Sequence, residues 1–153
     1  MRTLFFSLLA VLAFGCSSDN TETVFTPQTI DPVIIGKGFV NLSHDFDDEN
    51  RVIHTGAQWQ ELIDQMEAAR GGITDNFTET TIDFSQYDVV ASFTVSSSAT
   101  TIDMTNVTEN EDNVTVILQN LQLGLTQDVV HPFHIIKVEK TGKPFIFDDQ
   151  TGR

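Results

Sequence analysis

Hydrophobic and polar positions alternate with a period of two along most of the chain. The clearest alternation runs from Tyr87 to Val95, where Val89, Ala91 and Phe93 share one face. Six further β-rich stretches are bounded by turn residues, at 33–42, 51–54, 101–107, 114–125, 134–140 and 144–147. We expect the first two of these to pair as a hairpin across the polar loop of residues 45–50.

A helical period occurs once. Thr55 with Gln58 three residues later is a capping box, and Gly71-Gly72 after Arg70 is a stop signal. One apolar face follows the cap at helical spacing: Trp59, Leu62, Ile63 and Met66. The pattern predicts one amphipathic helix over residues 55–70.

One helix among many strands indicates a single α+β domain. We expect a curved antiparallel β-sheet of about six or seven strands, with the helix packed on one face. The domain should span residues 33–148, followed by a polar tail at 149–153.

The N-terminus predicts export. One cation, Arg2, precedes an apolar run of 12 residues, which ends at Gly15 immediately before Cys16. This order resembles a bacterial lipoprotein signal, in which residues 1–15 are removed and Cys16 becomes the first residue of the mature chain and carries lipid such as palmitate. An ordinary secretory signal and a retained membrane anchor are the alternatives. Residues 16–32 read as a flexible tether, which would place the domain at the cell envelope.

The charge narrows the classes of partner. With 22 acids and 8 bases the net charge is −14, and removing residues 1–15 lowers it by one to −15. Such a surface repels a phosphate backbone, which argues against nucleic-acid binding. A single cysteine excludes an intramolecular disulfide framework and a multi-cysteine metal cluster.

The histidines are His44, His54, His131 and His134. In a strand, His131 and His134 would point to opposite faces, so one transition metal would not suit both. Structural or solvated histidines are the interpretation we adopt. We predict no cofactor.

The polar loop offers oxygen ligands to calcium through Asp45, Asp47, Asp48 and Glu49. It departs from the EF-hand pattern, because the sixth position is Asn50 and the twelfth is Gly56. A solvated turn is the simpler interpretation, and weak calcium binding is the alternative.

Signals for catalysis are sparse. No Gly-x-Ser-x-Gly elbow is present. Asp83 is the carboxylate that we select for inspection, and a cap of a helix or turn is its structural alternative. A hydrolase would require a role for Asp83 or His134.

Three segments in order carry a family resemblance. The helix bears Trp59, a strand entry reads Asp83-Phe84-Ser85, and a later strand contains Pro132-Phe133-His134. Over roughly residues 53–147 the chain resembles the C-terminal domain family of the protease complex subunit PrcB. It departs from that family where a Gly-Gly turn is expected, because residues 96–101 read Ser-Ser-Ser-Ala-Thr-Thr.

The resemblance implies a non-catalytic envelope protein that assembles with or stabilises a partner protein, with a surface protease as one candidate. The motif residues then maintain the fold or contact the partner: Trp59, Asp83, Phe84, Pro132, Phe133 and His134. A small-ligand or calcium-binding envelope module is the alternative function.

Overall fold

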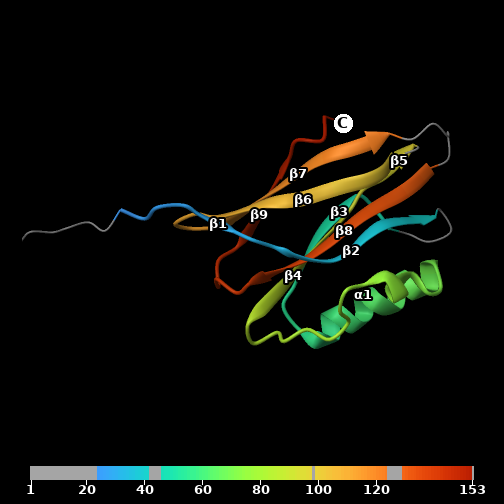
Figure 1. Cartoon of the computed structure of the whole chain (residues 1–153), viewed down its shortest axis with the longest axis horizontal. Helices are drawn as coiled ribbons and strands as arrows, with labels where there is room; N and C mark the ends of the chain where they lie inside the picture. Colours follow the sequence, from blue (N-terminus) through green and yellow to red (C-terminus); the bar gives the residue numbers. More distant parts are fainter. Residues whose placement is uncertain (1–23, 42–45, 98, 124–128, 153) are drawn as a thin grey trace, which may run out of the picture.

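The structure, a computed structural model, describes residues 24–41, 46–97, 99–123 and 129–152 and contains two β-sheets. The central sheet has the strand order β2-β8-β4-β3, with β5 paired to β8; the outer sheet has the order β1-β6-β7-β9 (Figure 1). The central strands are β2 (Val33–Asn41), β3 (Glu49–Ile53), β4 (Tyr87–Phe93), β5 (Ser96–Ser97) and β8 (Val129–Glu139). The outer strands are β1 (Gln28–Ile30), β6 (Ala99–Glu109), β7 (Val114–Leu123) and β9 (Phe145–Asp149). The helical elements are α1 (Gly56–Ala69) and a 3₁₀ turn, η1 (Ile73–Asn76).

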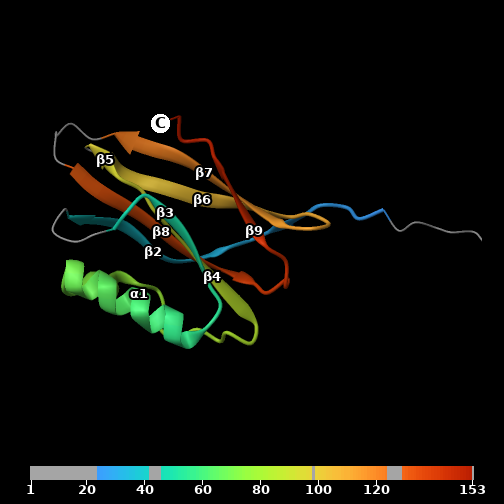
Figure 2. The same cartoon turned by 180° about the vertical axis from the view of Figure 1, so that it is seen from behind.

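The elements form three layers, with α1 on one face of the central sheet and the outer sheet on the other (Figures 1 and 2). The predicted α+β class with one α-helix is confirmed at this level. The prediction of one curved sheet is wrong, because the strands divide between two sheets and only the central sheet packs on α1.

The helix forms as predicted. The Thr55 hydroxyl accepts the Gln58 N–H at 3.3 Å, and the Gln58 side chain turns back to accept the His54 N–H at 3.0 Å. Trp59, Leu62 and Met66 are buried against the central sheet. The Trp59 indole N–H donates to the Thr80 carbonyl at 2.8 Å, so its one polar atom is also satisfied.

The strand β4 explains why a second layer is needed. Val89, Ala91 and Phe93 pack toward α1, while Val90 faces the outer sheet, and all four are at most 1% exposed. A sheet that is apolar on both faces must be covered on both. The outer sheet covers the second face with Ile102, Met104, Val107, Val114, Val116 and Leu118.

The predicted hairpin of residues 33–42 and 51–54 does not form. β2 pairs with β8 and β3 pairs with β4, so the two strands lie at opposite edges of the central sheet. The more apolar strands β4 and β8 take the central places, where burial is greatest.

The domain limits also change. β1 lies inside the predicted tether of residues 16–32 and pairs with β6, so the folded region begins before residue 33. β9 extends to Asp149, and the Gln150 N–H bonds to the Leu118 carbonyl at 2.8 Å, so the predicted tail of residues 149–153 starts within the fold. Cys16 and the predicted signal lie outside the described residues.

Strand pairing is antiparallel throughout both sheets except between β7 and β9, which are parallel. A parallel pair needs a crossover between its strands. Here the crossover is β8, a strand of the central sheet. None of the described helices is long and apolar enough to cross a membrane.

Gly36 supplies the first testable prediction. A Cβ at Gly36 would lie 2.5 Å from the Phe77 ring, which packs directly on the β2 backbone. We expect Gly36→Ala to lower the free energy of unfolding by about 1–3 kcal/mol, because the ring has to move. Urea unfolding of the variant beside Gly71→Ala is the measurement. A Cβ at Gly71 meets no described atom within 4 Å, so equal losses in both variants would contradict the packing argument.

Candidate functional site

A row of polar residues crosses the central sheet on its inner face, the face toward the outer sheet. Lys37 of β2 and Ser92 of β4 both lie opposite His134 of β8. Lys37 forms an ion pair with Asp103 of β6, and Asp103 also accepts a hydrogen bond from the Asn120 amide at 3.2 Å. The row therefore connects the two sheets by polar contacts that run from the buried His134 to the partly exposed ion pair of Lys37 with Asp103.

His134 is the centre of this row and is fully buried. Its Nδ1 accepts the backbone N–H of Met104 at 2.8 Å. That N–H lies in a part of β6 where the register to β7 shifts, between Asp103 and Asn106. Because Nδ1 accepts, the proton of the neutral ring is on Nε2. His134 is a hydrogen-bonded strand residue, as its structural interpretation predicts.

The environment of His134 opposes protonation. The pKa of His134 is lowered to about 4, mainly by burial and to a smaller extent by the Lys37 charge, against the opposing effect of Asp103. Nε2 of His134 and Oγ of Ser92 have no hydrogen-bond partner among the described residues. A histidine without solvent access serves packing and connection of the sheets.

Asp83 is an exposed turn cap. Its Oδ1 accepts the Ser85 N–H at 2.9 Å and the Ser85 hydroxyl at 2.6 Å, and its Oδ2 accepts the Gln86 amide at 2.7 Å. These hydrogen bonds, led by that from the Ser85 hydroxyl, lower the pKa of the Asp83 carboxyl. The carboxylate fixes the turn that leads into β4, which agrees with the structural alternative.

The other motif residues are part of the core. Phe133 is buried beside Phe93, with ring centroids 6.1 Å apart, and Phe84 packs partly buried against the same cluster. Pro132 lies opposite the break between β4 and β5, where its carbonyl accepts the Thr94 N–H at 3.0 Å. A proline has no N–H to donate to a strand ladder. It is tolerated at such a break because the ladder is interrupted there. The six motif residues do not gather into one site.

In the described part of the predicted calcium loop, two carboxylates bind other residues of the same chain. Asp48 Oδ1 accepts the Thr94 hydroxyl at 2.7 Å, and Glu49 forms an ion pair with Arg51. Asp47 is exposed, and Asp45 lies outside the described residues. In the described part of the chain, no group of three or more His, Cys, Asp or Glu side chains is placed to hold a metal ion.

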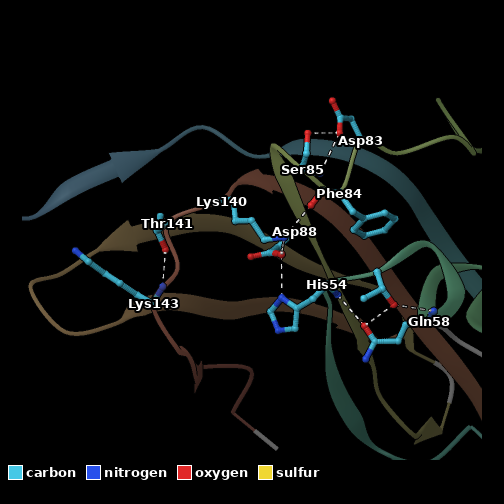
Figure 3. Close-up of polar contacts among 10 residues, drawn as sticks. His54, Gln58, Asp83, Phe84, Ser85, Asp88, Lys140, Thr141 and Lys143 are labelled. Carbon is cyan, nitrogen blue, oxygen red and sulfur yellow. Dashed lines mark hydrogen bonds and ion pairs between the residues drawn. The ribbon is translucent and has the colours of Figure 1, made fainter.

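A second polar cluster lies where β4 begins and β8 ends (Figure 3). The buried carboxylate of Asp88 contacts His54 Nδ1 at 2.8 Å and the Lys140 ammonium at 3.4 Å. Lys140 also donates to the Phe84 carbonyl at 2.8 Å, and His54 precedes the cap of α1. A carboxylate on one imidazole nitrogen orients the ring, as in a general base. Here it also ties three strand ends together, because His54 directly follows β3, Asp88 lies in β4 and Lys140 directly follows β8.

The two edges of the central sheet differ in how far they are covered. On β2, the carbonyls of Ile34 and Ile35 accept hydrogen bonds from Thr78 at 2.9 and 2.8 Å, and the Phe39 carbonyl accepts one from Arg70 at 3.3 Å. The segment after α1 therefore occupies the outer side of β2. Such cover is how native proteins protect an edge strand from pairing.

The β3 edge is open. Within the described residues β3 pairs only with β4, and a groove of about 430 Å³ runs between β3 and α1. We call this the β3–α1 groove. It is lined by Glu49, Arg51, Val52 and Ile53 of β3 and by Gln58, Glu61, Leu62 and Gln65 of α1.

Arg51 spans the groove. Its guanidinium donates to Gln65 of the helix at 2.7 Å and forms the ion pair with Glu49. It also lies 5.8 Å from the centroid of the Phe93 ring. The charge of Arg51 is therefore satisfied within the chain. Glu61, in contrast, is exposed and accepts one long hydrogen bond, 3.5 Å from Gln65.

The sequence does not identify the residues of the groove as one site. Periodicity places Arg51 in a strand and Glu61 on the polar side of the helix, but it does not show that the two elements run side by side. The cluster of His54, Asp88 and Lys140 was missed for a related reason, because its members are separated by 34 and 52 positions. Only the strand order brings either set together.

Comparisons with protein-family models, with curated proteins and with solved structures found no match. The resemblance to the PrcB C-terminal domain family therefore stays a prediction.

The buried state of His134 predicts a pH dependence of stability. The pKa is about 4 in the folded state against an ordinary 6.5, so the unfolded chain binds more protons between these values. The stabilisation is complete above pH 6.5 and is lost as the pH falls toward 4, by about 3 kcal/mol in total. Urea unfolding at half-unit steps from pH 4 to 7 measures it. His134→Asn, which retains an acceptor for the Met104 N–H but cannot titrate, should be less stable overall and show a flatter profile in this window. An unchanged slope in that variant would contradict the assignment.

Proposed function

We propose that this chain is a lipid-anchored, non-catalytic protein-binding domain of the bacterial envelope that acts as an accessory or stabilising subunit. The observation that carries the proposal is the open edge of β3 beside the β3–α1 groove. An unpaired strand edge next to a groove is a surface that extended protein segments bind by adding a strand. A surface protease is the partner class that the family resemblance favours.

The use of the other polar groups supports a binding role over a catalytic one. Asp83 caps a turn, and His134 is buried and bonded to the backbone of β6. Neither side chain presents a reactive atom in a cleft, which both general acid–base and nucleophilic catalysis require. The oriented imidazole of His54 is the exception, and its contacts connect strand ends.

A small-ligand module is the second candidate, favoured by a cleft of about 530 Å³ between the start of β2 and the end of β8. This volume lies within the range of ligand pockets. Its lysines, however, are already paired, Lys137 with Glu79 at 2.6 Å and Lys140 with Asp88 at 3.4 Å. The groove beside an open edge is the stronger basis for a function.

The anchor and the partner can be tested together in the native host. We expect Cys16→Ser to move the protein from the membrane fraction to the soluble fraction and to abolish labelling by a palmitate analogue. Deletion of the whole gene should lower the amount of one envelope protein, measured by quantitative proteomics of the membrane.

Ser17→Ala is the matched control for the anchor and should leave both fractionation and labelling unchanged. A membrane-bound Cys16→Ser protein would contradict the lipid anchor. Unchanged levels of every envelope protein after deletion, together with no cross-linked partner in intact cells, would contradict the accessory role.

A further inference from the structure

The direction of the backbone groups on β3 follows from the ladder of the central sheet. The Thr94 N–H bonds to the Pro132 carbonyl, so even-numbered residues of this part of the chain direct their N–H and C=O groups toward β8. The odd-numbered residues of β4 then face β3. Since Ala91 lies opposite Arg51, the odd-numbered residues of β3 are those bonded to β4.

Asn50 and Val52 therefore direct their N–H and C=O groups outward, away from the sheet. His54 is the next even-numbered residue along the chain, but its N–H already donates to the Gln58 side-chain oxygen at 3.0 Å. The edge is closed at its helix end and open over Asn50 and Val52. It offers two donors and two acceptors to an incoming strand, which is a short but complete hydrogen-bonding repeat.

A second copy of this chain is a poor occupant of the edge. In the antiparallel pairing that overlaps all of β3, Arg51 would lie directly opposite Arg51 of the other copy, and like charges opposite one another destabilise a strand pair. Each chain also carries a net charge of −14, so two copies repel at longer range. The occupant should be a different protein.

The charge of the groove indicates the chemistry of that occupant. Arg51 is neutralised by Glu49 and held by Gln65, whereas the Glu61 carboxylate is exposed on the opposite wall. A cationic side chain that entered between β3 and α1 would pair with Glu61. The floor of the groove is apolar, since Ile53 and Leu62 are buried beneath it.

We propose that the β3–α1 groove binds an extended segment of the partner protein, which pairs with Asn50 and Val52 as an additional strand and places a lysine or arginine against Glu61. This inference rests on the proposed accessory function and specifies its contact surface. The segment is short, because the Gln58 side chain closes the edge at His54. Arg51 remains paired within the chain and forms part of the groove wall.

Site-specific photo-cross-linking tests the location. The full chain is produced in its host with benzoylphenylalanine at the exposed Asn50 on the open edge, which leaves Glu61 in place, or, as a control, at the exposed Glu111 between β6 and β7. We expect a cross-link to one envelope protein from position 50 and none from position 111. Mass spectrometry of the product should identify an extended partner segment that contains a basic residue.

Affinity measurements test the chemistry. A labelled synthetic peptide of the cross-linked segment is titrated against the detergent-solubilised full chain by fluorescence anisotropy. Glu61→Lys should weaken binding about tenfold or more, and Asp64→Lys, the same charge change on α1 outside the groove, should have a much smaller effect. Val52→Pro removes one outward N–H but no bond to β4, and it should also weaken binding. Circular dichroism checks that each variant is folded, and Asn50→Pro replaces Val52→Pro where the latter is not.

The outcomes separate the site from the function. Equal capture of a partner from positions 50 and 111 overturns the groove assignment and leaves the accessory function standing. The same conclusion follows if the partner binds Glu61→Lys and the folded proline variant as well as it binds the native chain. A cross-linked segment without a basic residue overturns the proposed chemistry. The absence of a partner from both positions, with no envelope protein lost on gene deletion, overturns the function and the inference together.

Discussion

The burial of β4 and β8 on both faces is the constraint on which the rest of this structure depends. One face needs α1 and the other needs the outer sheet, so a chain of 153 residues is built as three layers around two cores. The inner face contains polar atoms as well as aliphatic side chains, and those atoms need partners away from water. β6 supplies one to the Nδ1 of His134 through the Met104 N–H, and the Asp103 carboxylate of β6 pairs with the partly exposed Lys37. These interior groups therefore contribute to the packing of the sheets, and the proposed protein-binding role rests instead on the exposed edge of β3.

The charged residues of the domain produce a net negative electric field. Each described lysine and arginine is bound to an acceptor within the chain: Lys37 to Asp103, Arg51 to Glu49, Arg70 to Phe39, Lys137 to Glu79, Lys140 to Asp88 and Lys143 to Glu109. The carboxylates in excess of these pairs produce the net negative field of the domain. Such a field increases the rate of encounter with cationic partners and weakens as salt is added.

Local signals predicted local structure well. The capping pair of Thr55 and Gln58, followed by an apolar face of period 3.6, was sufficient to define α1, and alternation was sufficient for β4. The strand order was beyond such signals, since β2 and β3 are neighbours in sequence but occupy opposite edges. β4 did contain a clue, because Val90 is apolar on the face opposite Val89 and Ala91, and a strand with two apolar faces requires two covers.

The role of an individual residue could likewise be predicted where its partners are close in the sequence, but not where they are distant. The turn-cap interpretation of Asp83 depends on residues two and three positions away, and it is confirmed. The hydrogen bond of His134 joins residues 30 positions apart, so the sequence could suggest a bonded strand histidine but not its partner. The β3–α1 groove depends on the strand order and could not be predicted at all.

The path of the chain through β7, β8 and β9 also affects when the fold can form. The chain leaves the outer sheet after β7, crosses to the central sheet as β8 and returns as β9, while β2 pairs with β8 about a hundred residues later. Neither sheet can be completed before the last quarter of the chain is available, and long-range pairing of this kind is slow. We expect this order to favour export, which the N-terminal residues predict, because a chain that lacks its complete sheets can still be threaded through a secretion channel.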